Sequence, residues 1–285
     1  MSTCLPPNPN PDPLDYTLPP NACDSHLHIF AEPSEFPHLN TRLFVPPIAT
    51  FEMYKSLQSK MGLSRAVVVH SAIYGTDLSC TIGALKKGAG LWRGVALVEP
   101  DITDEKLSTL DAIGFTGIRI NFPDWGGNSE LASKLANKIK PLGWHLQLLI
   151  TLDQLNENWR QLSGLGIPIV IDHMGYTKSA VALKHAGLQI FLDMLKDGYF
   201  WTKISGFDRV GTKEQQYDDV KPLVEKILSA NPNHVVWGSD WPHVRRNPVP
   251  NDGAMLNKAL SWIPDKKMQK LLLADNPANL YRFLN

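Results

Sequence analysis

The sequence predicts an α/β protein built as a single-domain (β/α)8 barrel, also called a TIM barrel. Eight short runs rich in Val, Ile and other strand-forming residues recur along the chain, and helical segments separate them. The runs lack regular polar alternation, which is typical of parallel strands buried on both faces. The eight units span about 250 residues, the usual size of this barrel.

Each predicted strand is a run of seven to ten residues. In order along the chain, the predicted strands occupy residues 21–30, 65–72, 92–100, 116–122, 144–150, 167–175, 199–207 and 234–242. The helical segments between them often end in Gly or Asn-Pro, as the C-termini of helices do. The clearest of these segments occupy residues 53–62, 103–114, 128–143, 152–166 and 218–232.

The two ends of the chain differ from its middle. Residues 1–20 contain seven prolines and predict an extended arm, partly in polyproline II conformation. Residues 21–285 then form the barrel, and residues 264–285 add two terminal helices at its end. Asn276 is expected to cap the second of these helices, with Pro277 at its first position.

An open, doubly wound parallel sheet is the main alternative to the barrel. Such sheets usually bind a nucleotide at a glycine-rich turn after the first strand. The candidate turn, GAGLWRG at residues 88–94, follows a helical segment and has the wrong glycine spacing. The barrel is therefore preferred.

The composition excludes several classes of protein. The formal net charge is zero, without a long basic run, so no nucleic-acid partner is expected. No stretch reaches the roughly 20 apolar residues of a membrane span, and the N-terminal residues lack the apolar segment of a secretory signal. Cys4, Cys23 and Cys80 are scattered and odd in number, which favours free thiols in a reducing compartment. We expect a cytoplasmic protein that acts on a small molecule, with its oligomeric state left open.

Polar residues gather at the ends of the predicted strands, where TIM-barrel enzymes place their catalytic groups. His26 and His28 end the first strand, His173 the sixth and Asp240 the eighth. Because residues i and i+2 of a strand face the same side, the first two histidines should point together into the barrel mouth, with Asp24 one layer below. A lone histidine is more often a hydrogen-bonded core residue. Three histidines and an aspartate converging from three strands favour a catalytic or metal site.

Several motifs resemble those of the amidohydrolase superfamily. They are DSHLHIF, IPIVIDHMG, VVWGSDWPH and NPANLYRF, with further matches in YGTD, GIRINF and GWHLQL. The most similar branch is that of 2-pyrone-4,6-dicarboxylate lactonase and its relatives, and the resemblance covers nearly the whole chain after residue 20. It implies a (β/α)8 barrel with a hydrolytic site.

The resemblance also implies roles for individual residues. Asp240 would be the general base that activates water, and the three histidines would surround the carbonyl oxygen that water attacks. Arg119 and Arg209 match arginines that hold a substrate carboxylate in the pyrone lactonase.

No organic cofactor is implied, but a metal is left open. A binuclear centre is not expected, because the fourth and fifth predicted strands offer no lysine or glutamate to bridge two ions. A single divalent ion such as zinc is the alternative to metal-free hydrolysis, which we favour. Its ligands would be His26, His28, His173 and Asp240.

Three functions are compatible with these residues. The first is a lactonase that opens the cyclic ester of a small or aromatic organic acid with water activated by Asp240. The second is a zinc-dependent, non-oxidative decarboxylase of an aromatic acid, as in a neighbouring branch. The third is a non-catalytic barrel that binds a metabolite. We favour the lactonase, and the absence of a G-x-S-x-G motif argues against a serine hydrolase.

Further substrate contacts are expected in the loops at the barrel mouth, where binding residues are common. Ser71, Tyr74 and His243 fall in these loops, with ordinary loop surface as an equal alternative for each. Trp125 follows the fourth strand closely enough to line the pocket.

Loop differences from the pyrone lactonase predict a different substrate. Two arginines of that enzyme align with Trp125 and Tyr176, and two of its tyrosines with Phe44 and Leu149. Arginine binds carboxylate through two parallel hydrogen bonds, so losing two arginines should weaken the binding of a dianion. We expect a larger, more apolar lactone with one carboxylate or none, in contact with Trp125 or Tyr176.

Overall fold

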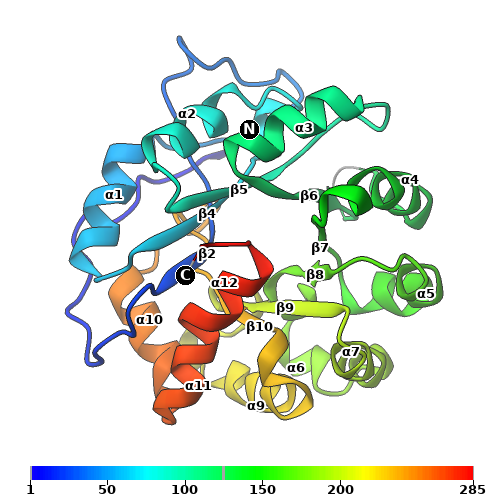
Figure 1. Ribbon diagram of the computed structural model, residues 1–285. Coiled ribbons are helices and arrows are strands. Elements are labelled where there is room, and N and C mark those ends of the chain that lie inside the picture. The colour runs from blue at the N-terminus through cyan, green and yellow to red at the C-terminus, as the bar shows by residue number, and fades with distance from the viewer. Residues whose placement is uncertain (1, 124–125, 285) are drawn as a thin grey trace.

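Eight parallel strands form the centre of the computed structural model, which describes residues 2–123 and 126–284 (Figure 1). The strands follow the order β10, β9, β8, β7, β6, β5, β4, β2, so each pairs with its neighbour along the barrel. The predicted (β/α)8 barrel is confirmed. Every predicted strand is present, seven of them in a shorter form and β6 shifted by one residue. The strands are β2 Cys23–Leu27, β4 Arg65–Val69, β5 Trp92–Ala96, β6 Phe115–Asn121, β7 His145–Leu149, β8 Ile169–Ile171, β9 Phe200–Ile204 and β10 Val235–Trp237.

Helices cover the outside of this barrel (Figure 1). Thr50, Thr103 and Thr151 each accept a backbone hydrogen bond at the start of the helix that follows, which satisfies an otherwise unpaired N–H group. The five helices predicted from sequence are α1, α3, α4, α5 and α9. The surrounding helices are α1 Phe51–Lys60, α2 Ser79–Lys87, α3 Asp104–Ile113, α4 Ser129–Ile139, α5 Leu152–Ser163, α6 Ser179–Ala182, α7 Ala186–Lys196, α8 Phe207–Val210, α9 Lys221–Ala230 and α10 Asp252–Ser261.

The barrel interior has its own apolar cluster, separate from the larger core between strands and helices. It is formed by residues from six strands, which can touch one another only inside the barrel. Three C-terminal residues join it and close the end at which the strands begin. The buried members are Cys23, Val67, Val69, Val95, Val170, Trp201, Val236, Leu280, Tyr281 and Phe283.

The C-terminal helices run on without a break. A π-helical turn, Leu271–Asp275, joins α11 (Lys266–Lys270) to α12 (Asn276–Leu280). The prediction that Asn276 caps a separate helix is wrong, because Asn276 itself has helical backbone angles. The π turn lets the helix continue into Pro277, which has no N–H group to donate. The Asn276 amide instead donates to the carbonyls of Pro232 and Val235, and so fastens the helix to the start of β10.

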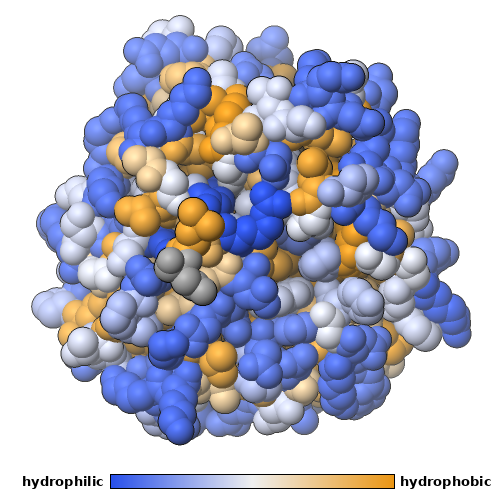
Figure 2. Space-filling view, viewed as in Figure 1, coloured by the Kyte–Doolittle hydropathy of each residue, from blue (hydrophilic) through white to orange (hydrophobic). Residues whose placement is uncertain are grey.

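The last residues seal this end of the barrel. The guanidinium groups of Arg65 and Arg93 both lie over the Phe283 ring, 4.9 and 4.7 Å from its centre. Arg65 also donates to the carbonyl of Leu284 at 2.6 Å. Figures 1 and 2 view the molecule from this end, and its surface is mostly hydrophilic with scattered small apolar areas. An opening to the strand ends that carry the histidines must therefore lie on the opposite face.

The proline-rich N-terminal arm lies along the barrel wall. The Asp12 and Asp15 backbones donate to the side chains of Asn251 and Asn257, at the start of and within α10. Further along, β1 (Ser2–Thr3) pairs in parallel with β3 (Phe44–Val45). Across the described residues, no helix has both the length and the apolar character needed to cross a bilayer.

Candidate active site

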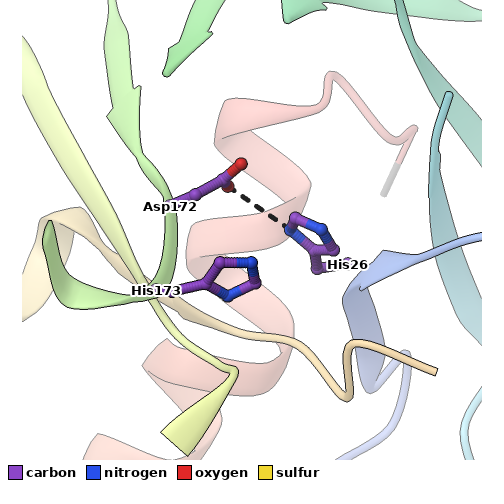
Figure 3. Close-up of side chains that lie close together, drawn as sticks. All are labelled: His26, Asp172 and His173. Carbon is purple, nitrogen blue, oxygen red and sulfur yellow. Dashed lines mark ion pairs between the residues drawn. The ribbon is translucent and has the colours of Figure 1, made fainter. Parts of the chain in front are cut away.

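Four predicted site residues meet at the end of the barrel where the strands finish. His26 lies in β2 and His28 follows it, with ring centres 5.1 Å apart. The His173 ring lies beside that of His26 (Figure 3), with ring centres 4.7 Å apart. Asp240 follows β10, and its Oδ1 lies 3.7 Å from His26 Nε2 and 3.5 Å from His28 Nε2. The predicted convergence of three histidines and one aspartate is therefore present.

Unusual backbone geometry brings these groups together. His173 and Asp240 both adopt left-handed backbone angles, with φ of 51° and 64°. Such conformations cost about 1–3 kcal/mol each and persist only where their surroundings fix them. Gly238 is required for a steric reason, since a Cβ there would lie 2.5 Å from the Cβ of His26. The chain after β10 thus passes close against β2 and places Asp240 beside the histidines.

The predicted position of Asp24 is wrong. The pairing register between β2 and β4 shifts between Asp24 and Leu27, so side-chain parity is not kept along the strand. Asp24 consequently points out of the barrel, where it accepts hydrogen bonds from Tyr54 of α1 and from the Ser239 backbone, at 2.7 and 2.9 Å. Burial raises the pKa of Asp24 to about 6, although these hydrogen bonds oppose the shift. Asp24 joins β2 to the segment after β10 and takes no part in the cavity.

Asp172 is a central residue that the prediction did not include. Its carboxylate lies 3.3 Å from His26 Nδ1 (Figure 3) and 3.2 Å from Arg119 Nη2. The fully buried Lys203 ammonium lies 3.6 Å away and donates to Gln147 at 2.7 Å. Burial opposes ionisation of Asp172, but its three neighbours hold its pKa well below the usual range. Asp172 therefore holds the Nδ1 side of the His26 ring in place and provides the negative charge that balances Lys203.

Asp240 is ionised in spite of its burial. Burial would raise its pKa, but the Arg209 guanidinium, whose Nε donates to Asp240 Oδ2, keeps the pKa well below the usual range. Burial lowers the pKa of His173 to about 4, so this ring is neutral near pH 7. The site thus presents a carboxylate with one oxygen held by arginine and the other facing two imidazoles.

An open cavity lies directly above these groups. Seven of the predicted residues line it, and Phe44 and Leu149 also lie in its wall. Two polar lining residues were not predicted: Asn121, whose buried Oδ1 has no partner within the described chain, and the exposed Arg245. The sequence pattern did not predict Arg245 as a site residue, because Arg245 lies in a loop beyond the end of the strand. The predicted residues in the lining are His28, Ser71, Arg119, His173, Tyr176, Arg209 and Asp240.

Two other predicted contacts, Tyr74 and His243, lie elsewhere. The Tyr74 hydroxyl accepts a hydrogen bond from the Ala31 backbone, and its ring packs behind Phe30. His243 is fully buried and bonded to Asp252 of α10 at 3.0 Å. Tyr74 and His243 are therefore parts of the framework and do not face the cavity. Trp125 lies outside the described residues.

Known proteins share the sequence pattern of the part of the chain that carries this arrangement. A family model described as amidohydrolase matches residues 23–283. The chain belongs to the amidohydrolase family. The resemblance drawn from its motifs is thereby confirmed.

Relatives of this amidohydrolase extend over nearly all of its length. It is 31% identical to a 4-sulfomuconolactone hydrolase from Hydrogenophaga intermedia, over 98% of this chain and 94% of that protein. It is also 31% identical to a 2-pyrone-4,6-dicarboxylate hydrolase from Comamonas testosteroni, over 95% and 93% of the two chains. A crystal structure of a probable 2-pyrone-4,6-dicarboxylic acid hydrolase from Acinetobacter baumannii, with citric acid bound, matches with a TM-score of 0.84 at 25% identity. That match covers 92% of this chain and all of the other.

The amidohydrolase has donor atoms that fit one metal ion. His28 Nδ1 lies 2.7 Å from the Val69 carbonyl oxygen and must donate a hydrogen bond to it. The other ring nitrogen, Nε2, therefore faces Asp240. His26 Nε2 has no hydrogen-bond partner among the described residues, and the ligand atoms of His26, His28 and Asp240 lie within 4.8 Å of one another. A second group, His26, Asp172 and His173, shares one histidine with the first. Nitrogen and carboxylate donors at this spacing suit a single divalent ion.

The buried His243–Asp252 pair makes the stability of the amidohydrolase depend on pH. Burial lowers the pKa of His243, but Asp252 outweighs it and the pKa rises from 6.5 to about 8. A histidine with a raised folded-state pKa contributes fully below its unfolded pKa and loses that contribution as the pH rises through the folded value. We expect the free energy of unfolding to fall by about 1.5 kcal/mol between pH 6.5 and 8.5.

Chemical denaturation of the wild type and His243→Gln at several pH values measures this decline. Glutamine keeps a hydrogen-bond donor toward Asp252 but does not titrate. The variant should therefore show a flatter profile above pH 6.5. Identical slopes in both proteins would contradict the assignment.

Proposed function

We propose that this amidohydrolase opens the ring ester of a small organic-acid lactone, with Asp240 as the general base. The supporting observation is the placement of Asp240 at the floor of the cavity. One carboxylate oxygen is held by Arg209, and Oδ1 faces His26 and His28. A water molecule bound at Oδ1 would give up its proton to the carboxylate as it attacks the lactone carbonyl. The ring C–O bond then breaks, and the leaving oxygen takes the proton that Asp240 received from water.

His173 is placed to stabilise the negative charge that develops on the carbonyl oxygen. Its Nδ1 lies 2.9 Å from the Ser205 hydroxyl. We assign the tautomer in which Ser205 donates to Nδ1, because this leaves a proton on Nε2 and His173 lines the cavity. A fixed N–H donor in a site shielded from water stabilises an oxyanion in the transition state.

The cavity combines positive charge with apolar walls. Arg119 Nε is buried and has no partner in the described chain, although Nη2 of the same group contacts Asp172. This side chain can therefore bind a substrate carboxylate. Phe30, Phe44 and Leu149 contribute apolar surface for the body of the lactone. The substrates named for the two hydrolase relatives carry sulfonate or carboxylate groups, which agrees with an acidic lactone here.

Hydrolysis is favoured over decarboxylation. The relatives that match at 31% identity over almost the whole chain are hydrolases. The cationic surroundings of Asp240 also suit a reaction in which negative charge builds up on a carbonyl oxygen. Release of carbon dioxide from a hydroxybenzoate would be the opposing result.

Ring-opening assays on a set of lactones test the proposal. The set should include 2-pyrone-4,6-dicarboxylate, a sulfonated or carboxylated muconolactone, a sugar lactone and a neutral aromatic lactone. We expect turnover of lactones that bear an acidic group on an otherwise apolar ring. Equally efficient hydrolysis of 2-pyrone-4,6-dicarboxylate and the best other lactone would overturn the predicted preference for a larger, more apolar lactone. Failure to open any acidic lactone would overturn the function.

Metal removal is expected to leave activity in place. A divalent ion at this site would polarise the carbonyl or lower the pKa of bound water. The local charge opposes such an ion: Lys203, Arg119 and Arg209 contribute three positive charges against two from Asp172 and Asp240, a net charge of +1 before any metal binds. We expect chelation to change kcat less than twofold. Metal analysis of the purified protein, with assays before and after chelation and after zinc addition, measures this directly. One bound ion per chain, whose removal abolishes turnover, would establish a metal enzyme.

A further inference from the structure

We propose that Arg245 binds a second anionic group of the substrate at the outer end of the cavity, and that the N-terminal arm positions it. This inference rests on the proposed lactone hydrolysis and names the substrate class more closely. The lactone would carry two anionic groups, one near Arg119 and Arg209 and the other near Arg245. This inference replaces the expectation of one carboxylate or none, because that expectation counted the lost arginines and did not include Arg245 in the lining of the cavity.

Arg245 differs from the other two arginines of the cavity. Arg119 and Arg209 are buried and contact Asp172 and Asp240. Arg245 is exposed, and across the described residues no carboxylate lies within ion-pair distance of it. Its charge is therefore available to an incoming ligand, and arginine suits a carboxylate or sulfonate because its planar fork donates two hydrogen bonds.

The surroundings of Arg245 also favour anions. Arg245 lines a second hollow beside the cavity, together with Lys178, Lys213 and Arg246. The acidic side chains in that hollow are Asp208 and Glu214, so four cations face two carboxylates and the net charge is +2. A concave surface with one sign of charge raises the local concentration of ligands of the opposite sign. The cavity is thus approached over a basic surface that ends at Arg245.

The N-terminal arm holds the backbone of Arg245 in place. Arg245 has a left-handed φ of 63°, and its N–H donates to the Sγ of the buried Cys4 at 3.2 Å. Immediately before Cys4, β1 pairs with β3, and the Cys4 backbone donates to Val45 at 2.9 Å. Phe44 of β3 lines the same cavity. One short segment of the arm therefore connects two walls of the site, and Cys4 is a positioning residue for Arg245.

Kinetics with a dianionic and a monoanionic lactone test the inference. We expect Arg245→Met to raise KM for the dianion about tenfold, with kcat within twofold, and to change KM for the monoanion less than twofold. Arg245→Lys should recover part of the loss. Cys4→Ala should raise KM for the dianion two- to threefold, and Cys4→Ser should keep it near the wild-type value. In the Arg245→Met background, Cys4→Ala should cause no further rise in KM. The matched control is Arg160→Met on α5, an exposed arginine outside the barrel, which should leave both KM values unchanged.

A binding measurement separates this inference from the function itself. Citrate is a suitable probe because it is a polyanion without a lactone ring. Calorimetry should show weaker citrate binding to Arg245→Met than to the wild type and the Arg160→Met control. If citrate binding depends on Arg245 but no lactone is opened, the function fails and the anion site stands. If lactones are opened and neither KM nor citrate affinity depends on Arg245, the inference fails alone. An additive effect of Cys4→Ala in the Arg245→Met background would overturn the role of the arm.

Discussion

Replacing Asp240 by asparagine is expected to lower kcat for lactone opening by about three orders of magnitude, the effect of losing a positioned general base. Asparagine has nearly the same shape and can still accept a hydrogen bond from Arg209, but its amide cannot take a proton from water. KM should change little, because the cavity walls and Arg119 are untouched. Steady-state kinetics on the best acidic lactone measure both constants.

The control for this experiment is Asp193→Asn, which removes an exposed carboxylate on α7. Circular dichroism and thermal unfolding must show that the Asp240→Asn protein is folded, since the substitution also leaves Arg209 without its charged partner. Full activity in a folded Asp240→Asn variant would exclude the proposed base.

Replacing Asp24 by alanine is expected to lower the free energy of unfolding by about 3–5 kcal/mol. The substitution leaves buried donors of Tyr54, Ser239 and His26 without an acceptor, and each such group costs about 1–3 kcal/mol. Asp24→Asn is the matched variant, because it keeps the size and one acceptor oxygen, and it should lose less than half as much. Denaturant unfolding of the three proteins gives the comparison. Similar losses in both variants would show that the charge itself, and not hydrogen bonding, stabilises this position.

Much of the fold was predictable because it depends on local pattern. Runs rich in strand-forming residues identified all eight strands, and Gly or Asn-Pro at the ends of the periodic segments marked where several helices end. Parallel strands in a barrel present their C-terminal ends at one mouth. Polar residues at those ends therefore identified His26, His28, His173 and Asp240 as neighbours, although they lie up to 214 positions apart.

Other features depend on long-range geometry that no local pattern contains. A register shift in β2 reverses the direction of Asp24, and a strict two-residue period cannot predict it. Asp172 was visible at a strand end, but its importance arises from Lys203 and Arg119, which come from other strands. The His243 loop reaches α10 instead of the cavity because Asp252 provides a buried partner. Arg245 is recognisable only once the N-terminal arm is seen beside it.

The closure of the barrel between β2 and β10 has a consequence for motion. Seven strand pairs are joined by ladders of main-chain bonds, two of them with a register shift. Across the described residues, the two end strands instead meet through the isolated bridge of Leu27 and Trp241 and the Asp24 side chain. Local opening occurs where the fewest cooperative bonds must break together. Amide hydrogens along this line should therefore exchange with deuterated solvent sooner than those between β6 and β7. His26 and Asp240 lie on opposite sides of this β2–β10 seam, so transient opening of the seam would separate the base from its imidazole neighbours. The rate of this opening would then determine how long the enzyme keeps its activity at elevated temperature.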